Sequence, residues 1–213
     1  MLGSRLGKLT IAAGVVGVGL LMAAVLFRDR RADLGPEPSR IVQDNMVVLP
    51  AGTYDDKDEV WTSRPKGGKR SWGIRGSGYA EAGRMWFDGF PGETGRYKVE
   101  LGVVLEADGD PEYRVSSGGT VLDEGRYRYA CEVLLCGATP EECPFKPRYI
   151  DLGVHRIETG ERIEVWGRST YPCGPEHGSY SRWFELRFTK ATGESDGEES
   201  RLQPELEPLT ARL

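Results

Sequence analysis

GRYKVELGVVL, residues 95–105, alternates apolar and polar side chains along most of its length. Tyr97 and Val99 fall on one phase of this alternation, and Lys98 and Glu100 fall on the other. Successive side chains of a β-strand point to opposite faces of the sheet, so the pattern predicts a strand with one buried face.

The same alternation returns in residues 149–165 and 183–190, and glycine-containing turns such as Asp88-Gly89 and Ser117-Gly118-Gly119 separate the runs. Few segments could form long helices, so residues 45–190 are expected to form one all-β domain, an antiparallel β-sandwich. Further residues expected to face its core are Leu101, Val103, Leu105, Ile150, Leu152, Val154, Ile157, Ile163, Val165, Phe184, Leu186 and Phe188.

Four stretches of this domain carry a family resemblance: residues 95–101 (GRYKVEL), 110–115 (DPEYRV), 149–165 (YIDLGVHRIETGERIEV) and 178–184 (GSYSRWF). They resemble the galactose-binding-like β-sandwich and are similar to carbohydrate-binding modules of families 6 and 35. The resemblance implies a jelly-roll sandwich that binds sugars without catalysis.

The carbohydrate-binding families open with an acidic strand that helps to bind a structural calcium ion. The corresponding stretch here, residues 46–51, has no carboxylate, so no cofactor is expected. Calcium stays open as an alternative because four acidic residues follow closely, although a solvated acidic loop is the favoured interpretation. These residues are Asp55, Asp56, Asp58 and Glu59.

Residues 9–27 carry no charged side chain and are long enough to cross a bilayer as a helix. We expect residues 1–8 to be a short tail, 9–27 a transmembrane anchor in contact with lipid, 28–44 a stalk and 191–213 a disordered acidic tail. A cleaved signal peptide is the alternative. The apolar run is long for a signal peptide, and charged residues follow where a cleavage site should lie.

The four cysteines lie in the predicted domain: Cys131, Cys136, Cys143 and Cys173. An even number suits two disulfides in an oxidising compartment, which predicts a domain outside the cytoplasm. Cys136 with Cys143, and Cys131 with Cys173, is the preferred pairing among three. Zinc binding with His177 is the disfavoured alternative because paired C-x-x-C knuckles are missing, so no metal is expected.

Met85 and Phe87 are expected to face the core, which places Trp86 on the solvent side. The same phase predicts that Trp166 and Trp183 point outward. Aromatic planes beside charged groups suit the apolar faces and hydroxyl rims of sugars. Polar residues on the same phase complete the expected ligand surface: Arg84, Asp88, Glu164, Arg168, Glu185 and Arg187.

Other function classes find little support. The chain has a net charge of −5, and no basic surface for nucleic acid is expected. No nucleophile elbow, phosphate loop or metal-binding helix is present, so an enzyme is not expected. We expect a membrane-anchored, extracytoplasmic, non-catalytic module that binds glycan. The alternative is an accessory or structural subunit of a larger membrane complex, docked through the sandwich and the single helix.

Overall fold

The computed structural model describes residues 39–191, which form twelve β-strands and one short 3-10 helix, η1. The elements are β1 (Ile41–Gln43), β2 (Met46–Pro50), η1 (Ala51–Thr53), β3 (Asp56–Lys57), β4 (Trp61–Ser63), β5 (Trp72–Ile74), β6 (Ala82–Phe87), β7 (Gly95–Leu105), β8 (Glu112–Ser117), β9 (Thr120–Arg126), β10 (Lys146–Ile157), β11 (Ile163–Arg168) and β12 (Trp183–Lys190). All strand pairs named below are antiparallel, and the expected all-β antiparallel sandwich is confirmed.

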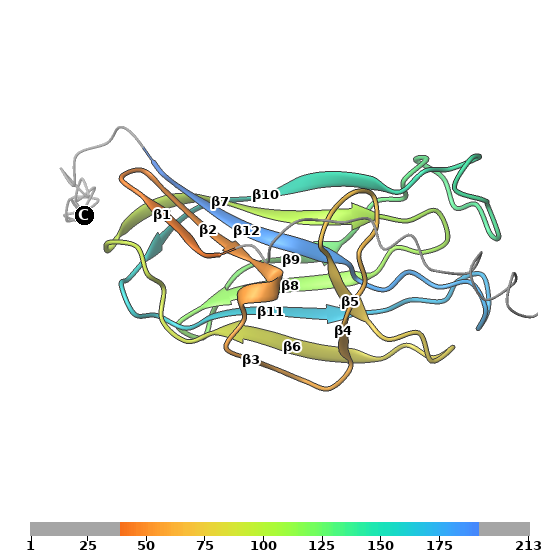
Figure 1. Ribbon diagram of the computed structural model, residues 1–213, viewed down its shortest axis with the longest axis horizontal. Helices are drawn as coiled ribbons and strands as arrows, with labels where there is room; N and C mark the ends of the chain where they lie inside the picture. The colour runs from red at the N-terminus through yellow and green to blue at the C-terminus, as the bar shows by residue number, and fades with distance from the viewer. Residues whose placement is uncertain (1–38, 192–213) are drawn as a thin grey trace, which may run out of the picture. The chain divides into compact units, whose positions relative to one another are not determined.

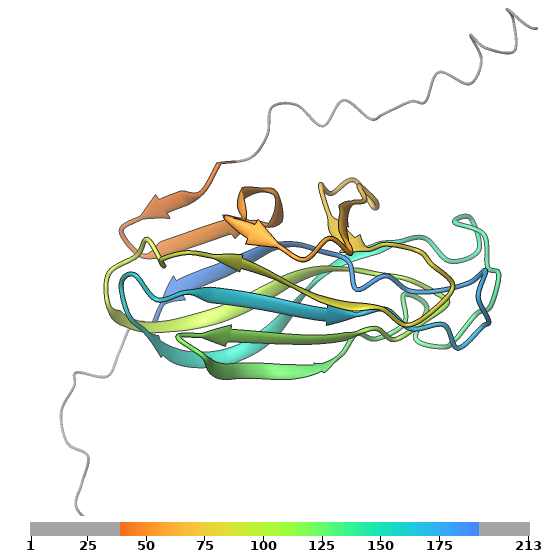
Figure 2. The ribbon, with the colours of Figure 1, turned by 90° about the horizontal axis from the view of Figure 1, so that it is seen from below.

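The strands form two sheets, which Figures 1 and 2 show as two layers. In the seven-stranded sheet, β12 pairs with β2 and β7, β10 pairs with β7 at one edge, β1 continues beyond β2, and β5 with β4 joins the start of β12. The five-stranded sheet has the order β3-β6-β11-β8-β9. Strands β10 and β9 are therefore edge strands of the two different sheets.

The core lies between the sheets and contains the apolar phase of the long strands. Tyr97, Val99, Leu101 and Val103 of β7 are all buried, as the alternation in residues 95–105 predicts. From the facing sheet, Met85 and Phe87 of β6 and Ile163 and Val165 of β11 are also buried. Burial of these side chains fixes which face of each strand meets solvent.

Trp183 does not point outward, and that prediction is wrong. Its side chain is 0% exposed and packs edge-to-face against Trp61 and Phe87, with ring centroids 6.5 and 6.2 Å apart. The cause is a register shift in β12 between Trp183 and Glu185. This β-bulge adds one residue to β12, so the alternation of inward and outward side chains reverses at this point. Phe184, which was expected in the core, therefore packs against Gly102 on the other face of the sheet.

A second bulge corrects the prediction for Val154, which is exposed although the alternation placed it inward. The register between β10 and β7 shifts between Asp151 and Gly153, and Gly153 has φ +90°. Glycine takes this conformation without a steric penalty, so the extra residue fits here. Leu152, the extra residue at the shift, is buried, and so is Ile157 at the end of the strand.

Several expectations concern the ends of the chain. Residues 1–8, the proposed anchor at 9–27 and most of the tail at 191–213 lie outside the described residues. Within residues 39–191, no helix is long and apolar enough to cross a membrane. Strand β1 falls inside the range 28–44 expected to form a stalk, and it pairs with β2.

The four cysteines form two disulfides, but the preferred pairing is wrong. Cys131 bonds to Cys143 and Cys136 bonds to Cys173. A turn explains the first pair, because Cys143 N donates to Thr139 O at 2.9 Å and so bends the chain back toward Cys131. The second bond then connects the β9–β10 loop to the β11–β12 loop.

We predict that peptide mapping of the unreduced protein recovers the Cys131–Cys143 and Cys136–Cys173 linkages. Replacing Cys136 and Cys173 together by Ala should lower the free energy of unfolding by roughly 3–4 kcal/mol, because the unfolded chain regains the entropy of a large loop. Urea denaturation measures this loss. Recovery of a Cys136–Cys143 peptide would contradict the structure.

Candidate functional site

The solvent face of the five-stranded sheet brings Trp86 and Trp166 together. Trp86 of β6 lies opposite Glu164 of β11, and Trp166 lies opposite Arg84. The two tryptophans are therefore diagonal neighbours on one face, and both are partly exposed. The other diagonal holds an ion pair, with Arg84 Nε 3.5 Å from Glu164 Oε1.

An arginine lies over each indole ring of this face. The guanidinium carbon of Arg162 is 5.7 Å from the ring centroid of Trp86, and that of Arg114 is 5.5 Å from the centroid of Trp166. Both arginines are also held by carboxylates, since Arg162 Nε lies 2.8 Å from an oxygen of Asp88 and Arg114 Nε donates to Glu124 at 2.7 Å. Hydrogen-bond donors are thus fixed beside two aromatic planes.

Arg168, the last of the predicted residues on this face, belongs to a network at one end of the sheet. Its Nη2 donates to Glu112 Oε1 at 2.6 Å, and the same oxygen accepts a hydrogen bond from Arg126 Nη2 at 2.8 Å. Arg126 also donates a hydrogen bond to Asp110, which raises the pKa of the Arg126 guanidinium. We call Arg84, Trp86, Arg114, Arg162, Glu164 and Trp166 the tryptophan face.

Two of the four acidic residues considered for calcium, Asp55 and Asp58, are used in other contacts. Asp55 Oδ2 accepts hydrogen bonds from Arg40 Nη2 and from the backbone N–H of Asp88, both at 2.7 Å. Asp58 accepts one from the backbone N–H of Arg84, also at 2.7 Å. These carboxylates hold the β3 segment against β6. Within residues 39–191 no group of three or more His, Cys, Asp or Glu side chains is placed to hold a metal ion.

Glu185 and Arg187 do not join the tryptophan face, because β12 belongs to the other sheet. They contact Tyr149 of β10. The Tyr149 hydroxyl donates to Glu185 and accepts from Arg187 Nη2 at 2.6 Å, and the Arg187 guanidinium carbon lies 4.3 Å from the Tyr149 ring centroid. Burial, followed by the Glu185 hydrogen bond, raises the pKa of the Tyr149 phenol.

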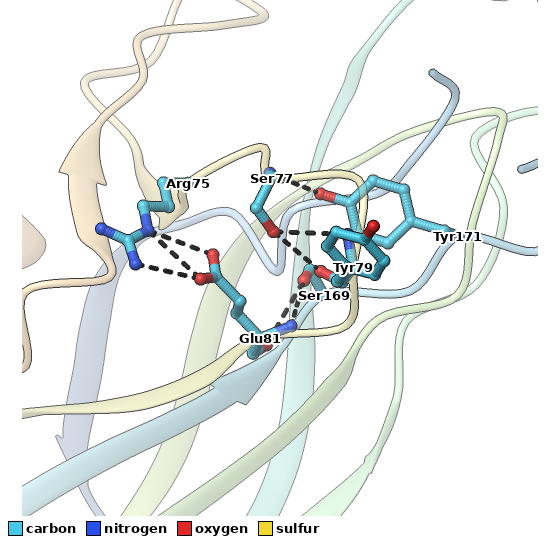
Figure 3. A network of polar contacts seen from close by, with 6 residues as sticks. All are labelled: Arg75, Ser77, Tyr79, Glu81, Ser169 and Tyr171. Carbon is cyan, nitrogen blue, oxygen red and sulfur yellow. Dashed lines mark hydrogen bonds and ion pairs between the residues drawn. The ribbon is translucent and has the colours of Figure 1, made fainter. Parts of the chain in front are cut away.

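Loops between the sheets form a second polar region, shown in Figure 3. In the β5–β6 loop, Arg75 pairs with Glu81 at 3.1 Å, and this contact lowers the pKa of the Glu81 carboxyl. The Tyr171 hydroxyl accepts from Ser77 N at 3.2 Å, and Ser169 bonds both backbone groups of Glu81. The β5–β6 and β11–β12 loops are thus tied together.

A buried ion pair lies beneath these loops. Arg182 Nε is 2.9 Å from Glu106 Oε1, and both side chains are less than 5% exposed. The other Glu106 oxygen accepts hydrogen bonds from Ser179 Oγ at 2.9 Å and Tyr180 N at 2.8 Å. Burial raises the pKa of the Glu106 carboxyl, while the Arg182 charge and the two hydrogen bonds oppose that rise.

Arg114 and Arg162 are site residues that the sequence analysis missed. Arg114 alternates with Tyr113 and Val115, both buried, so strand phase alone could have placed it outward. The register of β8 against β11, which sets Arg114 opposite Trp166, carries no signal in a single sequence. Arg162 precedes β11 in a turn, where no strand phase applies.

We predict that Arg182→Met lowers the free energy of unfolding by about 3–5 kcal/mol at pH 7.5, because Glu106 is left charged and buried. A carboxyl whose folded pKa is raised favours folding at low pH and loses that contribution as pH rises. The loss of unfolding free energy in Arg182→Met should therefore be smaller at pH 5 than at pH 7.5, and urea denaturation at the two pH values measures it. Arg156→Met, at an exposed arginine, is the control, and a deficit equal at both pH values would contradict the prediction.

No family model and no curated protein matches the chain. Three solved structures illustrate the kinds of protein to which this chain is similar. The C-terminal family 6 carbohydrate-binding module of LamC, a laminarinase from Zobellia galactanivorans, is 18% identical, with 68% of this chain and 100% of that chain covered and a TM-score of 0.43. A family 35 carbohydrate-binding module from Clostridium thermocellum is 9% identical, with coverage of 68% and 98% and a TM-score of 0.45.

The third, the insecticidal crystal protein Cry2Aa, is 11% identical, with 70% of this chain and 22% of that chain covered and a TM-score of 0.47. The matches include modules of both families that the sequence resembles. At these identities and TM-scores the likeness does not indicate a ligand.

Proposed function

We propose that this protein is a non-catalytic binding module that holds a neutral glycan on the tryptophan face. The observation that carries the proposal is the diagonal placement of Trp86 and Trp166 on a solvent-facing sheet surface. Partly exposed aromatic side chains gathered on one surface indicate an interaction site, because soluble proteins rarely leave such apolar patches in contact with water.

The polar groups around the two rings suit sugars in particular. Pyranose rings have apolar C–H faces that pack on indole planes, and their hydroxyls both donate and accept hydrogen bonds. Arg114 and Arg162 supply donors beside the rings, and Glu164 supplies an acceptor between them. All three side chains are held in place by neighbours, so little conformational entropy is lost when a ligand binds.

The proposal includes delivery of this module by the N-terminal segment. The uncharged run at residues 9–27 would anchor the chain in a membrane, with the disulfide-bonded domain on the extracytoplasmic side. Two disulfides in the domain support an oxidising compartment. The alternative role, an accessory subunit of a membrane complex, also requires the anchor. In that role a protein partner, and not a glycan, would cover the tryptophan face.

We predict that Trp86→Ala and Trp166→Ala each weaken glycan binding by about tenfold or more, equivalent to roughly 1.4 kcal/mol. The measurement is isothermal titration of the full chain in detergent with soluble neutral glucans, mannans and galactans. Tyr79→Ala is the matched control, because Tyr79 is 78% exposed but lies on the β5–β6 loop outside the tryptophan face. Its affinity should equal that of the unmodified protein.

Stable folding of each variant is checked by its urea midpoint, since neither tryptophan is part of the buried core. Absence of binding to every glycan of the panel, together with co-purification of one partner subunit from solubilised membranes, would reject the glycan proposal in favour of the accessory role. Binding that survives in both tryptophan variants would place the site elsewhere.

A further inference from the structure

The edge of the sandwich carries a groove that is distinct from the tryptophan face. It has a volume of about 950 Å³ and lies where the edge strand β10 of one sheet meets the β9 edge strand of the other. The start of β10 and the residues that follow β9 form most of its lining. We call it the edge groove.

The lining of the edge groove is basic, although the whole chain has a net charge of −5. It contains four cations, Arg126, Arg128, Lys146 and Arg148, against two carboxylates, Asp110 and Glu132. The Asp110 carboxylate is already paired with Arg126, with oxygen and Nη1 3.0 Å apart. The groove therefore has a local excess of positive charge.

Three of these cations have no carboxylate partner within residues 39–191. Arg148 donates only to the carbonyl of the adjacent Pro147 at 3.0 Å, and Arg128 and Lys146 make no hydrogen bond or ion pair to a described side chain. Most other cations of the domain do have such partners, as Arg84, Arg114 and Arg168 show. Neighbouring like charges without counter-charges repel one another, so an anion that lies between them is favoured.

Aromatic rings lie beside the basic side chains of the edge groove. Tyr129 and Tyr149 both line the groove, and both are at least partly exposed. The Tyr149 ring is fixed between Phe184, at a centroid distance of 5.6 Å, and the guanidinium group of Arg187. Tyrosine rings beside cations that lack a carboxylate partner combine a surface for sugar C–H groups with a site for their acidic substituents.

A basic hairpin extends the positive field beside the groove. Residues 64–70, between β4 and β5, contain four basic side chains and no acidic one. This hairpin packs on the start of β10: a Cβ at Gly67 would lie 3.3 Å from Pro147 Cδ, and Lys66 Nζ is 5.1 Å from the centroid of the Phe145 ring. The field increases the local concentration of a polyanion near Lys146 and Arg148.

We propose that the edge groove is a second carbohydrate site, which binds a carboxylated polysaccharide through Arg128, Lys146 and Arg148 with Tyr129 and Tyr149 against the sugar rings. The site uses none of the residues of the tryptophan face. Its carboxylate preference follows from the free guanidinium groups, which form two parallel hydrogen bonds to a carboxylate. The volume of the groove lies within the range of roughly 300–1,000 Å³ that is typical of ligand pockets.

Polygalacturonate is the probe, titrated into the full chain in neutral detergent, with neutral dextran as its uncharged counterpart. Arg128→Gln, Lys146→Gln and Arg148→Gln combined should weaken polygalacturonate binding by about tenfold or more, because the three charge-assisted contacts are lost. Binding to the unmodified protein should weaken as salt rises from about 50 to about 300 mM. Tyr129→Ala should also weaken binding, with the charge unchanged.

The matched control combines Arg75→Gln, Arg156→Gln and Lys190→Gln, which removes the same charge from exposed cations outside the groove. Equal losses in the two triple variants would overturn the proposal, because only net charge would then matter. Equal binding of a DNA duplex or of anionic phosphatidylserine vesicles through the same three residues would also overturn it.

Trp86→Ala combined with Trp166→Ala separates this site from the proposed neutral-glycan site. That variant should bind polygalacturonate with unchanged affinity. If the neutral panel fails while polygalacturonate binding depends on the three cations, only the tryptophan-face proposal is lost. If polygalacturonate does not bind the unmodified protein at all, the edge-groove proposal is wrong whatever the neutral panel shows.

Discussion

Met85 and Phe87 are held in the core by hydrophobic burial, and the pleat of β6 then leaves Trp86 on the solvent side. The same relation in β11 fixes Trp166 through its buried neighbour Val165. The buried neighbours in each strand, and not the arginine that lies over each indole ring, fix the face on which the tryptophan lies. Their common face is a by-product of how the two strands bury their apolar side chains, so any ligand that binds there does so on a rigid part of the scaffold.

Alternation also marks where sequence reasoning succeeds and where it fails. It predicts the sandwich, the buried phase of β7 and the outward direction of Trp86 and Trp166. It fails at Trp183, because a bulge adds one residue and has no signature in a single sequence. Trp61 has no reliable phase in a short polar segment, yet it is buried against Trp183, which only the pairing of distant strands can specify.

Cross-strand register and loop contacts are the other information that a single sequence lacks. The ion pair between Glu106 and Arg182 joins residues far apart in the chain, and the preferred cysteine pairing was wrong for a similar reason. The edge groove is lined by residues from both sheets and from a loop, so its charge excess is visible only after folding. The composition of the whole chain is acidic, and it gives no sign that one groove on the folded domain is basic.

The two disulfides interleave, since Cys136 lies inside the segment closed by Cys131 and Cys143 and bonds outside it to Cys173. A single break of the backbone anywhere between Cys131 and Cys173 therefore leaves the two pieces joined by at least one sulfur–sulfur bond. A protease that nicks the exposed Val133–Leu135 stretch would not release a fragment. The nicked molecule would stay covalently continuous until a reductant reached it.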